Sequence, residues 1–224
     1  MEKKTSSSTN LDTKPPKISW IVDSLFKNPS TSLVLSNYQI QGEEKKTNAF
    51  GVCAAPGKNI AKGRDGKTHQ RDIEVDIKYY KDNFQIDMIV CLLNKYELRT
   101  IGVDLDRYQK ACENNAIQLI IYPIVEMGVP SHSPEEFDVQ VMNSIFEGIL
   151  NNKKVICHCR GGIGRAGTVA SCLLMKAKIC RGPKNAISTV RALRDPKCVE
   201  SRKQEDFIDK YSKVMTGSLM KKQN

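Results

Sequence analysis

Short apolar runs alternate with amphipathic stretches along most of the chain. A continuous apolar run of a few residues is typical of a buried strand, and apolar residues recurring every three or four positions are typical of a helix. The predicted strands cover residues 49–54, 86–93, 117–121 and 155–157, and the predicted helices cover 73–80, 104–112, 133–149, 165–177, 183–194 and 207–214. This alternation predicts a single α/β domain, with a mostly parallel central sheet and helices on both of its faces.

Two predicted helices have clear start signals. Asp104 can cap the helix that carries Tyr108 and Cys112 inward, since a carboxylate accepts hydrogen bonds from the first free amides. The run from Ser133 to Glu136 supplies a cap, a proline at the first position and a glutamate at the third. Residues 57–69 are rich in glycine and lysine and are predicted to form a loop.

The two ends of the chain differ from the middle. Residues 1–17 are polar and rich in serine, threonine and lysine, which predicts a disordered tail. Residues 216–224 resemble them and are predicted to be a flexible C-terminal tail. The intervening residues, 18–215, are expected to form the one domain that a chain of 224 residues supports.

The chain is basic, with 35 Lys and Arg against 25 Asp and Glu, a net charge of +10. This charge favours anionic partners without naming them, and it serves solubility equally well. No apolar stretch has the length of a membrane span, and the N-terminus has no signal-peptide core. We therefore expect a cytoplasmic protein, with the nucleus as an alternative, and reduced thiols for its eight cysteines. Three scattered histidines and the lack of CxxC pairs predict no metal site and no cofactor.

The stretch from His158 to Arg165 carries the chemistry, because it joins a predicted central strand to a helix. Ligands of parallel sheets bind at this end of the strands. Glycines let successive amides turn inward, and the helix start adds positive potential, so both a thiolate and a phosphate are stabilised there. Cys159 is the predicted nucleophile, and the planar fork of Arg165 is the predicted phosphate ligand. The other phosphate-binding candidates are Arg160, Gly161, Gly162, Ile163 and Gly164. His158 either supports the thiolate or is a structural histidine.

This His-Cys-x5-Arg pattern resembles the signature of the protein tyrosine phosphatase superfamily, in its dual-specificity branch. Residues 50–57, residues 96–98 and the segment from Tyr122 to Pro130 resemble the kinase-associated, or cyclin-dependent kinase inhibitor 3, subgroup. The resemblance implies a protein tyrosine phosphatase-like fold. It also implies a two-step reaction without metal, through a cysteinyl-phosphate on Cys159.

The resemblance also assigns roles near the loop. Glu126 stands where the family usually has an aspartate as general acid, and it is the expected acid here, with a solvated loop carboxylate as the alternative. Ala166 replaces a hydroxyl residue that helps the thiolate leave. Gln204 matches a glutamine near the pocket, where it would position water, unless it is an exposed helix residue. Cys91 is either a redox partner of Cys159 or a core cysteine, and the core interpretation is preferred.

The resulting functional hypothesis is a protein phosphatase acting on phosphotyrosine and, in a shallow pocket, on phosphoserine and phosphothreonine. A phosphatase for phosphoinositides or RNA 5′-phosphates is an alternative, and a phosphoprotein-binding scaffold with weak catalysis is another. The expected partner is a phosphoprotein, for which the subgroup suggests a cyclin-dependent kinase. Nucleic acid is not an expected partner.

Overall fold

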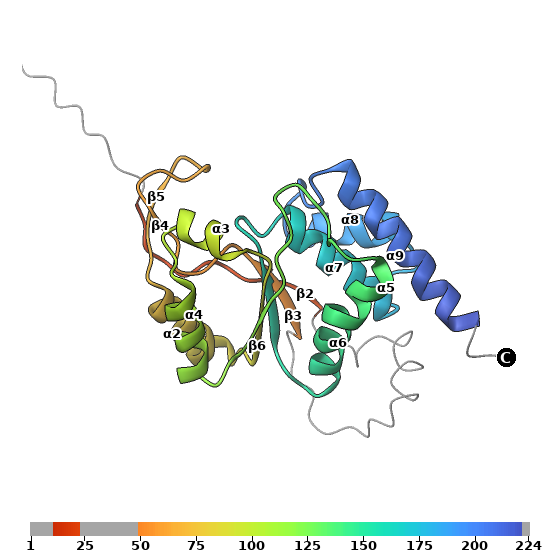
Figure 1. The fold of residues 1–224 in the computed structure, drawn as a ribbon, viewed down its shortest axis with the longest axis horizontal. Helices are drawn as coiled ribbons and strands as arrows, with labels where there is room; N and C mark the ends of the chain where they lie inside the picture. The colour runs from red at the N-terminus through yellow and green to blue at the C-terminus, as the bar shows by residue number, and fades with distance from the viewer. Residues whose placement is uncertain (1–10, 23–48, 221–224) are drawn as a thin grey trace, which may run out of the picture.

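The computed structural model describes residues 11–22 and 49–220, with side chains up to Met215 (Figure 1). A five-stranded sheet lies at its centre, in the order β2-β3-β8-β6-β7. The strands are β2 (Ser19–Val22), β3 (Phe50–Cys53), β6 (Met88–Cys91), β7 (Gln118–Ile121) and β8 (Val155–His158). Only β2 runs antiparallel to its neighbour in this sheet, and the other pairs are parallel. The prediction of a mostly parallel sheet is confirmed.

Helices cover both faces of the sheet, as predicted, and Figure 1 shows the two groups on either side of β6 and β3. One face carries α2 (Ile73–Phe84), α3 (Lys95–Thr100) and α4 (Leu105–Asn114). The other carries α5 (Pro134–Phe137), a π-helical turn η2 (Asp138–Met142), α6 (Asn143–Leu150), α7 (Gly164–Lys176), α8 (Pro183–Leu193) and α9 (Arg202–Met220). Because strand side chains alternate between faces, Cys53 and Ile156 enter the first core and Val52 and Cys157 the second. Among the described helices, none is long and apolar enough to cross a membrane.

Both predicted helix caps are present. Asp104 Oδ1 accepts hydrogen bonds from the amides of Asp106 and Arg107, each at 3.0 Å. Ser133 Oγ accepts from the Glu136 amide at 3.2 Å, and the Glu136 carboxylate accepts from the Ser133 amide at 3.1 Å. The caps fix where two helices start, because they satisfy amides that have no partner within the helix.

The predicted tails are wrong at their inner ends. Leu11–Asp12 forms strand β1, which pairs in parallel with β5 (Thr68–Gln70), and β5 pairs with β4 (Asn59–Ile60) in a small second sheet. The carbonyl of Pro16 also accepts a hydrogen bond from the Tyr80 hydroxyl at 3.0 Å. These contacts use backbone groups, so a polar composition did not reveal them. Helix α9 likewise continues to Met220, and residues 1–10 and 221–224 lie outside the described residues.

Four short elements were not predicted. The loop expected at 57–69 contains β4 and most of β5, α3 follows β6 directly, and β2 forms the antiparallel edge. Each is only two to six residues long. Such short segments give no periodic pattern to detect. The two small strands belong to the segment that contributes Lys58, Arg64 and Arg71 to the cavity lined by Cys159.

Candidate active site

The predicted nucleophile lies at the centre of the molecule. Strand β8 ends at His158, helix α7 begins at Gly164, and Cys159 follows the strand directly. The Gly162 amide points back at Cys159 Sγ, with an N–S distance of 3.3 Å. Gly162 has φ +70°, and a Cβ atom there would lie 2.2 Å from the carbonyl oxygen of Cys53. Only glycine fits this close approach, so this part of the loop geometry depends on its sequence.

Arg194, just after α8, holds the outer side of the loop. Its Nε donates to the Gly162 carbonyl and its Nη2 to the Gly161 carbonyl, both at 3.1 Å, while Nη1 donates to Ser19 Oγ at 3.2 Å. Carbonyls bound on the outer side keep the loop curled, with amides turned toward the sulfur. The sequence analysis assigned Arg194 only to a helix end. Nothing in its local pattern pointed to the loop.

Arg165 is buried at 3% exposure and is held by one of its nitrogens. Nη1 lies 2.7 Å from both Glu97 Oε1 and the Ile124 carbonyl oxygen. Glu97 is itself held in a capping box with Asn94 at the start of α3. All hydrogen bonds that the Arg165 side chain makes to the described residues come from Nη1, and none comes from Nε or Nη2. This free edge of the guanidinium has the geometry to bind two oxygens of one phosphate.

His158 is completely buried and links the strand to α4. Its Nε2 lies 2.8 Å from the Tyr108 hydroxyl, and its Nδ1 lies 3.3 Å from the Cys159 carbonyl oxygen. Burial lowers the pKa of His158 to about 4, so the ring is neutral near pH 7. A neutral ring fits both contacts when Nδ1 donates to the carbonyl and Nε2 accepts from tyrosine. These contacts fit His158 as a structural support for Cys159 rather than as a proton donor in the reaction.

Glu126 lies at the mouth of the same cavity, in the loop after β7 that is termed the acid loop here (residues 122–130). Both of its carboxylate oxygens pair with the guanidinium of Arg64, with Nη2 2.9 Å from Oε2. The hydrogen bonds from Arg64 hold the pKa of Glu126 below its usual range. The sequence analysis missed Arg64, because it stands 62 positions away in a loop that had no assigned role.

Gln204 is completely buried, so the alternative of an exposed helix residue is wrong. Its Oε1 accepts from the Glu200 amide at 2.8 Å, and its Nε2 donates to the Gly128 carbonyl at 3.1 Å. Ser201 Oγ donates to the Met127 carbonyl at 2.9 Å. The start of α9 therefore holds the acid loop in place.

The remaining sequence candidates fall in the core. Ala166 is buried and offers no hydroxyl, and Thr168 Oγ1 donates to the Gly164 carbonyl at 3.0 Å, along its own helix. Cys91 is buried beside His158 in the neighbouring strand, and burial raises the pKa of its thiol to about 12. A protonated, buried thiol favours the interpretation of Cys91 as a core cysteine.

One cavity of about 620 Å³ lies at the carboxyl end of β8, next to Cys159. Cys159 and Arg165 line it together with Arg160 of the loop and Glu126 of the acid loop. The cavity extends further, toward Lys58 and Arg71 in the segment that forms the small sheet. The residues predicted from sequence as nucleophile, phosphate ligand and acid are thus brought to one place.

A sequence profile described as "Swiss Army Knife protein, DSP-PTPase phosphatase domain" matches residues 68–208. The chain belongs to this family of dual-specificity phosphatase domains. Cyclin-dependent kinase inhibitor 3 of Rattus norvegicus is 28% identical over 178 residues, covering 76% of this chain and 74% of that protein. Its Homo sapiens counterpart is 26% identical over 174 residues, with the same two coverages of 76% and 74%.

Solved structures agree with the fold of this phosphatase domain. Kinase associated phosphatase, crystallised with serine in place of its catalytic-site cysteine, superposes with a TM-score of 0.68 at 24% identity. The match covers 92% of this chain and 98% of that chain. Tk-PTP in its active form gives a TM-score of 0.57 at 24% identity, covering 78% of this chain and 94% of that chain. The resemblance inferred from the signature loop is confirmed.

Proposed function

We propose that this domain is a cysteine-dependent protein phosphatase that hydrolyses phosphotyrosine and also phosphoserine and phosphothreonine. The arrangement of Cys159 and Arg165 carries the proposal. A backbone amide is directed at the sulfur, and two nitrogens of a buried guanidinium are unpaired among the described residues in the same cavity. Preorganised donors of this kind stabilise the transition state of phosphoryl transfer more than they stabilise the bound substrate.

In the first step, Cys159 attacks phosphorus. A sulfur–phosphorus bond forms, the bond to the leaving oxygen breaks, and that oxygen takes a proton from Glu126. Arg165 and the loop amides hold the three remaining oxygens. Because Glu126 is paired with Arg64 as a carboxylate, it acts as an acid only in the protonated fraction that this pairing keeps small.

In the second step, water attacks phosphorus and the sulfur–phosphorus bond breaks, which releases inorganic phosphate and the thiolate. Glu126 now accepts a proton from that water. Ala166 provides no hydroxyl for the departing sulfur, and the Thr168 hydroxyl is bonded within α7. Hydrolysis of the intermediate is therefore expected to be the slow step.

The relatives favour a phosphoprotein as substrate, and the name of the rat and human relatives makes a cyclin-dependent kinase the first one to test. A second candidate is a phosphoinositide. The Dictyostelium discoideum phosphatidylinositol 3,4,5-trisphosphate 3-phosphatase cnrN is 24% identical over 180 residues, covering 69% of this chain but 27% of that protein.

Turnover of p-nitrophenyl phosphate and of a phosphotyrosine peptide tests the proposal. The wild-type chain should release phosphate from both, and Cys159→Ser should release none. Acid quenching during turnover should trap a phosphorylated peptide containing Cys159, detected by mass spectrometry. Binding of the phosphopeptide without turnover by the wild type would instead establish a scaffold and overturn the enzyme.

A further inference from the structure

The cavity reaches two buried cations that the reaction above does not use. Lys58 is 8% exposed and Arg71 is 5% exposed, and both line the cavity that contains Cys159. The Arg71 amide donates to the Lys58 carbonyl at 3.1 Å, so the two residues lie side by side at the start of the small sheet. Lysine and arginine are rarely buried to this degree without an anionic partner.

One residue connects this pair to the signature loop. Arg71 Nη2 donates to the Ala55 carbonyl at 3.1 Å, and the Ala55 amide donates to the Arg160 carbonyl at 3.2 Å. Arg160 is the residue after the nucleophile, and its side chain lines the same cavity. Lys58, Arg71 and Arg160 therefore line one side of the cavity as a cationic group. Arg160 belongs to the signature loop, and Ala55 links Arg71 to it through two hydrogen bonds.

Arg71 has an unmet hydrogen-bonding capacity. Its Nε is itself fully shielded from solvent and has no hydrogen-bond partner, and no other side-chain nitrogen or oxygen of the described residues is both fully shielded and unpartnered. Buried donors are nearly always paired in folded proteins. An unpaired nitrogen on a guanidinium whose residue lines the cavity points to a ligand that would bind this arginine.

The neighbouring carboxylates in the described part of the chain leave Arg71 without an ion pair, and Lys58 has one weak ion pair, with Asp65. The Lys58 ammonium donates to His69 Nε2 at 3.0 Å, while Asp65 is 3.9 Å from it. Asp12 contacts the other nitrogen of His69 at 2.8 Å. Asp76, which faces Arg71, accepts from the Gly57 amide at 2.7 Å, and burial raises its pKa to about 6. Within the described residues, no carboxylate forms an ion pair with Arg71.

We propose that Lys58, Arg71 and Arg160 form a second anion subsite, which binds a second phosphate on the peptide whose first phosphate occupies the Cys159 loop. This inference rests on the proposed protein phosphatase function and narrows its substrates to doubly phosphorylated segments. A peptide fits better than a membrane surface, because acidic side chains share the lining of the cavity. They are Asp12, Asp65, Glu126 and Glu200. An anionic bilayer favours an uninterrupted basic surface.

Binding to the full chain carrying Cys159→Ser tests the subsite without turnover. Isothermal titration would compare a phosphotyrosine peptide with versions that add a phosphoserine one, two or three residues away. A matched series with glutamate at those positions separates a phosphate from an acidic side chain. We expect the best doubly phosphorylated peptide to bind about tenfold more tightly than the singly phosphorylated one, as charge-assisted hydrogen bonds predict. The glutamate peptides should gain less than half of that factor.

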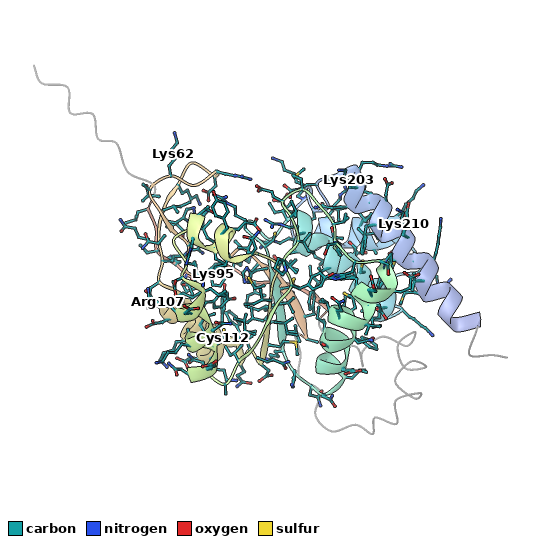
Figure 2. All side chains as sticks on the ribbon, in the orientation of Figure 1. Lys62, Lys95, Arg107, Cys112, Lys203 and Lys210 are labelled. Atoms are coloured by element: carbon teal, nitrogen blue, oxygen red, sulfur yellow. The ribbon has the colours of Figure 1, made fainter. Side chains whose placement is uncertain are left out.

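Lys58→Gln in the Cys159→Ser chain should reduce the tenfold preference for the doubly phosphorylated peptide to about twofold, because glutamine can still contact His69 but carries no charge. Arg71→Lys should reduce it less, since it keeps the charge and loses the fork. Lys62→Gln is the matched control. It removes the same charge from the same segment, and Lys62 is exposed and points away from the molecule (Figure 2). It should leave the preference unchanged.

Equal binding of singly and doubly phosphorylated peptides by the Cys159→Ser chain would overturn the subsite, and this comparison needs no further variant to fold. A preference that survives Lys58→Gln in a folded protein would also overturn it. An equal gain with glutamate would show that the subsite takes any anion rather than phosphate. If inositol bisphosphate bound tightly and no peptide did, the peptide assignment would be wrong. Phosphate release from p-nitrophenyl phosphate reports separately on the enzyme.

Discussion

The signature loop and the acid loop face each other across one cavity, but they are built differently. The loop from Cys159 to Arg165 is fixed from all sides, by Glu97, by Arg194 and by the start of a buried helix. Glu126 in the acid loop is 39% exposed, and its partner Arg64 is 67% exposed. The proposed phosphate-binding loop is thus held by many contacts, and the proposed general acid is accessible to solvent. Four changes would break or sharpen this contrast.

Arg165→Lys should have the largest effect. Lysine cannot hold Glu97 and two phosphate oxygens together, so kcat/KM for an aryl phosphate should fall by about 10³-fold. Steady-state kinetics with p-nitrophenyl phosphate measure this. Arg181→Lys, at an exposed position in the connection between α7 and α8, is the control and should behave like the wild type. A loss below tenfold would mean that Arg165 is not the phosphate ligand.

Glu126→Gln should lower kcat/KM by about 10²-fold for phenyl phosphate, whose leaving oxygen needs a proton. The loss should be severalfold smaller for p-nitrophenyl phosphate, which leaves readily without one. Comparing the two substrates is therefore the measurement. Glu135→Gln on α5 removes an exposed carboxylate and serves as the control. Equal decreases in kcat/KM for both substrates would show that Glu126 is not the general acid.

Gly162→Ala should destabilise the domain by about 2 kcal/mol, as strained positions with positive φ do. Gly66→Ala is the control that separates the backbone strain of a positive φ from a steric clash of the added Cβ. Gly66 has φ +75° and no atom within 4 Å of an added Cβ, whereas the Gly162 Cβ would meet the Cys53 carbonyl. Urea unfolding should show the larger loss for Gly162→Ala, together with reduced turnover. Equal destabilisation of both variants would show that the close approach to Cys53 is unimportant.

Arg64→Gln should have the smallest effect on activity. Its effect should be seen mainly in the pH dependence of kcat/KM. Arg64 lowers the pKa of Glu126, so its removal raises that pKa and keeps the acid protonated to higher pH. The basic limb of kcat/KM for phenyl phosphate should therefore move up in pH. Stability should change by less than about 1 kcal/mol, because both side chains are exposed. A basic limb that stays in place would show that Arg64 does not control the acid.

The contrast between the two loops also explains what could be read from the sequence. Cys159, Arg165 and the glycines stand within seven consecutive residues, and the caps at Asp104 and Ser133 are local signals of the same kind. Arg64, Arg71 and Arg194 act through contacts that depend on folding. No local pattern marks them, since an arginine in a loop or at a helix end is ordinary. The small sheet was missed for a related reason, because its strands pair through backbone groups.

The contacts of Arg194 determine how well this protein tolerates substitution at that position. Its guanidinium joins the carbonyls of Gly161 and Gly162 to Ser19 at the edge of the sheet, which lies 175 positions before Arg194 in the chain. No other side chain offers donors in this geometry. A library of random variants selected for phosphatase activity should therefore retain Arg194 almost as strictly as Cys159, although it lies outside the signature. The boundary of the functional motif is set by contacts in space and extends well beyond the eight residues that identify the family.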